Sequence, residues 1–251
     1  MKVNINSDYQ KYLREYNISF NNEIDTQNFN FTTYNSELIV KTKKLEWDSS
    51  FFNKNAGCIC SIQGTLDLNE KDLFVDFLNK ISDDSSYEIL FFRLSYNPFH
   101  FFELIQHTNF IIYDILNIYA IESRLVKIEN ETSACHLVNY NKDFQNDLMK
   151  IASKSFIISR IYKDSKLSEK ADLFYKNFTN SLINNSNNYC KVAEINGKLC
   201  GFIIGQTDVL NPKLCYLSLI AVSEDYSGKS IGKELFKAFI QDFGRHHELI
   251  E

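Results

Sequence analysis

The sequence lacks several features that define broad functional classes. It has no excess of positive charge, because 27 Lys and Arg stand against 32 Asp and Glu, and this argues against a general nucleic-acid binder. No run approaches 18 apolar residues, so we expect no membrane-spanning helix. The opening stretch MKVNINSDYQKYLREY contains no apolar signal-peptide core. We therefore expect a cytoplasmic protein without a nucleic-acid or membrane partner.

Metal-binding spacing is also absent. Cys58 and Cys60 form a C-x-C pair, but no two further ligands follow at a distance typical of a zinc site. Without a secretion signal, we interpret all six cysteines as reduced and mostly buried thiols. The sequence thus predicts no metal site and no disulfide framework.

The 251 residues suit one or two α/β domains. We interpret residues 1–30 as an irregular lead-in and 31–130 as an N-terminal α/β domain, in which 111–122 forms a strand. The segment NEKDLFVDFLNKIS predicts an amphipathic helix with Leu73, Phe77 and Ile81 on one face, and Pro98 marks the entry of the next helix.

A second domain spans residues 131–251, with the predicted element order β-α-α-β-β-β-α-β. Its clearest local signal is Asn196-Gly197 between two strand-like runs, since this dipeptide supplies the two positive φ angles of a type I′ hairpin turn. The next run, KLCYLSLIAV, is apolar for most of its length and predicts a central strand.

A glycine-containing loop follows this strand in LSLIAVSEDYSGKSIGKELF, residues 217–236. The letters GKS match the tail of a nucleotide-triphosphate loop, but that motif needs glycine at position 223, where Ser223 stands. Gly228 and Gly232 do not fit the dinucleotide fingerprint G-x-G-x-x-G either. Successive amides on a turn at a helix N-terminus nevertheless predict an anion site. A polar loop that only caps a core helix is the alternative.

The same stretch resembles the pyrophosphate loop of the GNAT N-acetyltransferase superfamily, which follows a strand ending in a phrase like IAV. The resemblance implies the acyl-CoA N-acyltransferase fold, a mixed sheet flanked by helices, with acetyl-CoA as co-substrate. It departs from the family at Ser227, where Gln or Arg is usual, and at Ser230, where glycine is usual. If position 230 needs a positive φ, serine costs about 1–2 kcal/mol there. The residues implied to bind the cofactor are Ile220, Ala221, Val222, Ser227, Gly228, Lys229, Ser230, Ile231, Gly232 and Lys233.

Two further stretches narrow the resemblance to bacterial dTDP-fucosamine acetyltransferases. They are LEWDSSFFNKNAG at 45–57 and FIISRIYKDSKLSEKADLFYKNFTNSL at 156–182, and in the second the matching residues are Ser159, Arg160, Asp164, Ala171, Leu173 and Tyr175. This resemblance implies acetyl transfer to the amine of a nucleotide-linked amino-deoxysugar for cell-surface glycan synthesis, and allows a homodimer. It implies that Arg160 binds the substrate, because arginine forks onto phosphates or a carboxylate; a surface or structural ion pair is the alternative.

The catalytic residues stay unassigned. The predicted central strand offers no carboxylate, only Tyr216 and Ser218, while Glu224 and Asp225 lie beyond it. The family's usual acid, a tyrosine after the next strand, has no counterpart before position 251. We therefore expect this sequence to lack the last strands of the domain. A non-catalytic acyl-CoA-binding relative and a GNAT enzyme acting on another amine, such as a protein N-terminus, are the alternative functions.

Overall fold

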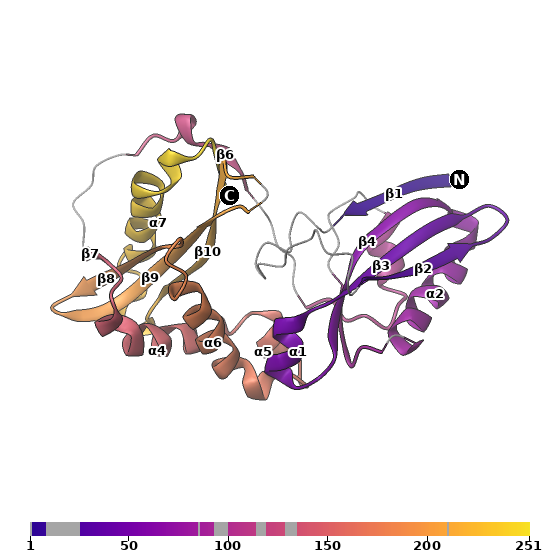
Figure 1. Cartoon of the computed structure of the whole chain (residues 1–251), viewed down its shortest axis with the longest axis horizontal. Helices are drawn as coiled ribbons and strands as arrows, with labels where there is room; N and C mark the ends of the chain where they lie inside the picture. The colour runs from indigo at the N-terminus through magenta and orange to yellow at the C-terminus, as the bar shows by residue number, and fades with distance from the viewer. Residues whose placement is uncertain are drawn as a thin grey trace. The chain divides into compact units, whose positions relative to one another are not determined.

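The computed structural model describes residues 2–8, 26–84, 86–92, 100–113, 119–128, 135–209 and 211–251. The chain divides into two compact units, Met1–Ile112 and Tyr113–Glu251 (Figure 1). The division falls earlier in the sequence than the boundary that we expected near residue 130. Pro98 lies outside the described residues.

The first unit contains a five-stranded sheet in the order β1-β4-β3-β2, with β5 added beside β4. The longest strand is β4, which pairs in parallel with β5 near its start and antiparallel with β1 near its end. The strands are β1 Lys2–Asp8, β2 Thr26–Thr32, β3 Glu37–Lys44, β4 Ala56–Asp67 and β5 Ile89–Phe92. The expectation of an irregular segment over 1–30 was therefore wrong for β1 and for the start of β2.

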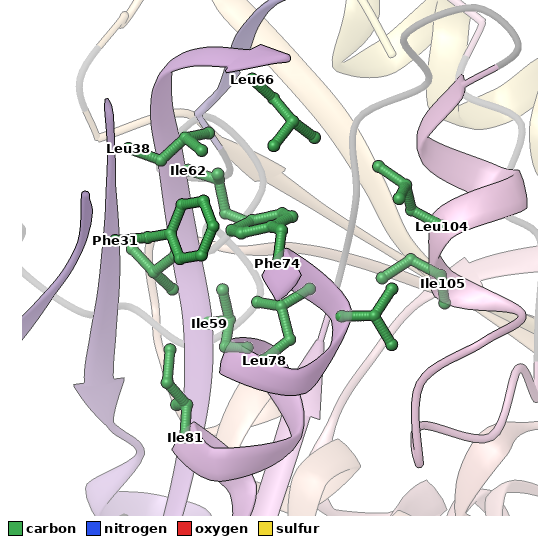
Figure 2. Packing of buried hydrophobic residues seen from close by; sticks show 12 residues of the cluster. Phe31, Leu38, Ile59, Ile62, Leu66, Phe74, Leu78, Ile81, Leu104 and Ile105 are labelled. Carbon is green, nitrogen blue, oxygen red and sulfur yellow. The ribbon is translucent and has the colours of Figure 1, made fainter. Parts of the chain in front are cut away.

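The helices of this unit are α1 Glu46–Phe52, α2 Lys71–Asp84 and α3 His100–Ile105, and a 3₁₀ turn at Leu68–Glu70 leads into α2. Helix α2 packs on the sheet through Phe74, Leu78 and Ile81, and the Phe74 ring meets the Phe31 ring edge-on at 5.2 Å (Figure 2). The helix was predicted correctly, and of the three residues expected on its buried face Ile81 is buried and Phe77 packs partly buried against the core. Leu73 was assigned wrongly, because it is 55% exposed and the neighbouring Phe74 is buried instead.

The second unit contains a six-stranded sheet in the order β6-β11-β10-β9-β8-β7. All neighbours are antiparallel except β10 and β11, which run parallel. The strands are β6 Ile121–Glu122, β7 His136–Asn139, β8 Tyr189–Ile195, β9 Lys198–Thr207, β10 Leu214–Val222 and β11 Leu249–Ile250. Among the described residues of the strand expected over 111–122, only β6 is a strand. It pairs with β11, which is why it belongs to the second unit.

The α-helices among the described residues of this unit are α4 Gln145–Ser155, α5 Arg160–Lys163, α6 Ala171–Ile183 and α7 Ile231–Asp242. Helices α4 and α6 cover one face of the sheet, and α7 covers the other (Figure 1). Helix α7 lies so close to β9 that a Cβ added at Gly205 would stand 2.2 Å from Cε2 of Phe239. The predicted mixed sheet flanked by helices is confirmed, and so is the predicted order of the long elements.

Candidate functional site

The central strand β10 is irregular at one position. Its pairing with β9 runs Leu217↔Gly205 and then Leu219↔Ile204, so Ser218 is an extra residue that forms a β-bulge. Strand β11 pairs with β10 at Leu214 and Cys215, and two further bonds join Glu251 to β10: its N–H donates to the Cys215 carbonyl at 2.9 Å, and its carbonyl accepts from the Leu217 N–H at 2.8 Å. Within the described part of the chain, the β10 ladder beyond the bulge is therefore formed with β9 alone.

The loop after β10 is held at both ends by backbone hydrogen bonds. The Ser223 N–H donates to the Cys200 carbonyl at 2.8 Å, and the Ser227 N–H donates to the Glu224 carbonyl at 3.0 Å across a 3₁₀ turn over Glu224–Tyr226. Helix α7 then begins at Ile231, whose side chain is only 1% exposed and anchors the helix start in the core. Between these anchors the loop residues 227–230 are exposed.

Two loop residues adopt the left-handed conformation, Gly228 at φ +75° and Ser230 at φ +59°. Glycine adopts this region freely, whereas serine is strained there. The side chain of Ser230 makes no capping hydrogen bond to α7. A Cβ at Gly228 would meet nothing within 4 Å, so the space beside its backbone is open.

The start of α7 is suited to an anion. Its first backbone N–H groups, those of Ile231, Gly232 and Lys233, have no acceptor inside the helix by construction, and the helix dipole adds partial positive charge there. Lys229 supplies a full charge, and its Nζ lies 4.9 Å from the centre of the Tyr226 ring. An exposed, open-sided turn that ends at a helix N-terminus fits a pyrophosphate group.

Arg160 lies on a different element. It is the half-buried first residue of α5, which connects α4 to α6. Beside it, Tyr162 donates a hydrogen bond to Oδ1 of Asp172 at 2.6 Å. Burial, reinforced by this carboxylate, raises the pKa of the Tyr162 hydroxyl far above its usual range. The Tyr175 ring stacks on that of Phe156 at 4.7 Å. The segment that carries Arg160 is thus fixed by buried aromatic and polar contacts.

The cysteines near β10 are not nucleophiles at neutral pH. Burial raises the pKa of the Cys200 thiol to about 11, that of Cys215 to about 11 and that of Cys190 to about 12. All six cysteines lie in described residues and form no disulfide bond. Among the described residues no cluster of three or more His, Cys, Asp or Glu could hold a metal ion, and no helix there is long and apolar enough to cross a membrane.

The sequence interpretation missed a polar network behind the bulge. Tyr216 and Ser218 both donate to the side chain of Gln206, which in turn donates to Asn188. A signal was present in the sequence, because Gln206 occupies the same face of β9 as the core residues Phe202 and Ile204.

One family model matches part of the second unit. Residues 147–251 match the model of the acetyltransferase (GNAT) family. No match was found among curated proteins.

Three similar solved structures illustrate the likeness. PH1933 from Pyrococcus horikoshii OT3 is 16% identical over 46% of this chain and 75% of its own, with a TM-score of 0.38. The ribosomal-protein-S18-alanine N-acetyltransferase from Escherichia coli is 17% identical over 45% of this chain and 61% of its own, with a TM-score of 0.33. The PaiA N-acetyltransferase from Thermoplasma acidophilum was solved in complex with coenzyme A. It is 19% identical over 44% of this chain and 74% of its own, with a TM-score of 0.32.

The family model covers α4 to α7 and β8 to β11 almost completely. Residues 147–251 thus resemble the acetyltransferase domain of this family, and the match indicates that the protein is an N-acetyltransferase. Enzymes of this family use acetyl-CoA as the acetyl donor.

Proposed function

We propose that this protein transfers the acetyl group of acetyl-CoA to the amine of a nucleotide-linked amino-deoxysugar, in the cytoplasm, for cell-surface glycan synthesis. The observation that carries the acetyl-CoA half is the loop after β10. It combines left-handed backbone at Gly228 and Ser230 with the N-terminus of a 12-residue helix. Several backbone N–H groups and the charge of Lys229 can therefore contact one pyrophosphate.

In this proposal the loop residues 227–233 hold the pyrophosphate. The backbone amides of residues 220–222 that point away from β9 polarise the thioester carbonyl, as preorganised dipoles do in oxyanion sites. Acetyl-CoA supplies the activated acyl group. The buried thiols of Cys190, Cys200 and Cys215 stay protonated, which favours direct attack by the acceptor amine over an acyl-enzyme on one of these three cysteines.

The acceptor half rests on the segment around Arg160. Arg160 begins α5, which lies between α4 and α6 in the sequence. A planar guanidinium matches the phosphates of a nucleotide sugar in a bidentate arrangement. The sequence phrases at 45–57 and 156–182 support the amino-deoxysugar as the group that carries the amine.

Titration calorimetry with acetyl-CoA tests the donor site. We expect saturable binding and an affinity about fivefold weaker in Lys229→Ala, because the variant loses one charge beside a phosphate, about 1 kcal/mol. Lys198→Ala, which removes an exposed lysine from the start of β9, is the matched control and should bind as wild type does. Absence of binding to the wild-type protein would refute the donor assignment.

Thiol release with a panel of amines tests the acceptor. The panel contains dTDP-4-amino-4,6-dideoxygalactose, a peptide with an N-terminal alanine, and a simple amine such as spermidine. We expect the nucleotide sugar to be preferred, and Arg160→Ala to raise its KM about tenfold without changing the KM of acetyl-CoA. Lys166→Ala removes an exposed cation a few residues away and should have no effect. A preference for the peptide or spermidine would refute the sugar as acceptor.

A further inference from the structure

A directed chain of hydrogen bonds runs from β10 through β9 to α6. The hydroxyls of Tyr216 and Ser218 donate to Oε1 of Gln206 at 3.2 and 2.8 Å. Nε2 of Gln206 donates to Oδ1 of Asn188 at 3.2 Å, and Nδ2 of Asn188 donates to the Leu182 carbonyl at 2.9 Å. Gln206 is 4% exposed and Tyr216 8%. Burial holds these hydrogen bonds in place, because each buried polar group that loses its partner costs about 1–3 kcal/mol.

The bulge is what places both hydroxyls on one acceptor. Tyr216 faces Gln206 directly across the ladder, and the extra residue Ser218 lets a second β10 side chain reach the same amide oxygen. Bulges commonly re-aim a side chain beside an active site. The amides that we assign to the thioester begin two residues later, at Ile220. Ser218 therefore lies next to the place where the acetyl group is transferred.

The direction of these bonds determines what Ser218 can offer a substrate. A hydroxyl has one proton and two lone pairs, and here the proton is committed to Gln206. What remains is an acceptor for an N–H group. An amine held by such an acceptor keeps its own lone pair for the thioester carbon. A carboxylate at the same place would instead favour the protonated ammonium, which cannot attack, and the residues Leu214–Val222 contain none.

We propose that Ser218 binds the acceptor amine through its hydroxyl oxygen, and that Gln206 is the positioning residue that holds this hydroxyl in the accepting orientation. The inference rests on the acetyl-transfer function proposed above and assigns its amine subsite. It requires an acceptor with at least one N–H besides the attacking lone pair, that is, a primary or secondary amine.

Steady-state kinetics with acetyl-CoA and dTDP-4-amino-4,6-dideoxygalactose test the role of Ser218. We expect Ser218→Ala to lower kcat/KM for the amino sugar about tenfold, the value of one hydrogen bond, while the KM of acetyl-CoA and the thermal stability stay near wild type. Ser218→Thr keeps the hydroxyl and should recover most of the loss. Ser181→Ala is the matched control, because the Ser181 hydroxyl donates to the Phe178 carbonyl of its own helix α6. It should behave as wild type.

A pH profile tests Gln206 by a readout that a merely structural role would not move. In Gln206→Glu the new carboxylate still accepts both hydroxyl protons, and its charge stabilises the nearby ammonium. The acid limb of kcat for the amino sugar, which reports ionisations in the bound complex, should therefore shift to higher pH. An unshifted limb together with a wild-type kcat/KM for Ser218→Ala would overturn the proposal while acetyl transfer stands. A wild-type protein that acetylates no amine would overturn both.

Discussion

The left-handed backbone at Ser230 predicts that replacing this serine by glycine stabilises the protein. The residue has φ +59° and ψ +12°, and its side chain makes no capping bond that the change would remove. Left-handed geometry costs an L-residue about 1–2 kcal/mol, whereas a glycine adds about 0.4–1 kcal/mol of entropy to the unfolded chain. The difference leaves Ser230→Gly more stable by about 0.5–1 kcal/mol. At this size of protein that corresponds to a rise in Tm of roughly 1–4 °C.

Two variants in the same loop separate backbone strain from other effects. Ser227 has an ordinary φ of −59°, so Ser227→Gly brings only the entropy cost and should lower stability by about 0.4–1 kcal/mol. Gly228 has φ +75° and open space around a Cβ, so Gly228→Ala should lower stability by about 0.5–1 kcal/mol, because strain of about 1–2 kcal/mol exceeds the entropy of about 0.4–1 kcal/mol that alanine removes from the unfolded chain. Calorimetric thermal unfolding and urea titration of the three variants give the comparison. A Ser230→Gly variant that loses stability as Ser227→Gly does would refute the assigned backbone geometry.

Three further outcomes follow from packing and burial. Gly205→Ala places a Cβ 2.2 Å from Cε2 of Phe239, so it should lower the free energy of unfolding by about 2–3 kcal/mol and speed hydrogen exchange in α7. Tyr162→Phe removes the bond to the Asp172 carboxylate and should cost about 1–2 kcal/mol at pH 7. Hydrogen bonding to Lys154 and then to Tyr162 holds the pKa of this carboxyl below its ordinary 3.8. The stabilisation is therefore complete above the ordinary pKa of 3.8 and is lost as pH falls through the lower pKa that Asp172 has in the folded protein. Urea titrations should show the difference in unfolding free energy between wild type and Tyr162→Phe becoming smaller below about pH 4. The Cys190 thiol, whose pKa burial raises to about 12, should resist iodoacetamide at pH 8 in the native protein and react after unfolding in guanidinium, as mass spectrometry will show.

Local turn chemistry explains why the second unit could be predicted from the sequence. The Asn196-Gly197 dipeptide has φ angles of +52° and +73°, as the hairpin interpretation requires. With that hairpin placed, β8, β9 and β10 follow from their apolar runs. A positive φ at Ser230 was also considered, because related loops usually have glycine at this position, and the observed φ is +59°.

Non-local pairing explains what the sequence did not reveal. Strand β1 has the polar sequence KVNINSD and is paired with β4, more than 50 residues away, so no local pattern marks it. The error at Leu73 of α2 has a related cause. Leu73 and Phe74 are adjacent apolar residues, and only contact with the sheet decides which one is buried. Gln206 was overlooked because a single polar residue in an apolar run reads as an interruption, whereas here it satisfies two hydroxyls from the neighbouring strand.

The bulge at Ser218 is dispensable for the ladder, and this gives the sharpest test of its purpose. Cys215 and Leu217 face the α7 side of the sheet, and Leu219 and Ala221 face the α4 and α6 side. Deleting Ser218 would make the register Leu217↔Gly205, Leu219↔Ile204 continuous and would leave every one of these side chains on its present face. The free energy of unfolding of the deletion variant should therefore lie within about 1 kcal/mol of the wild-type value, because the variant loses one hydroxyl hydrogen bond and gains a regular ladder. It should also transfer acetyl groups more slowly than Ser218→Ala, since it loses the local bend as well as the hydroxyl. If the bulge serves folding instead, the deletion would unfold the second unit, and circular dichroism would show that loss before any kinetic measurement.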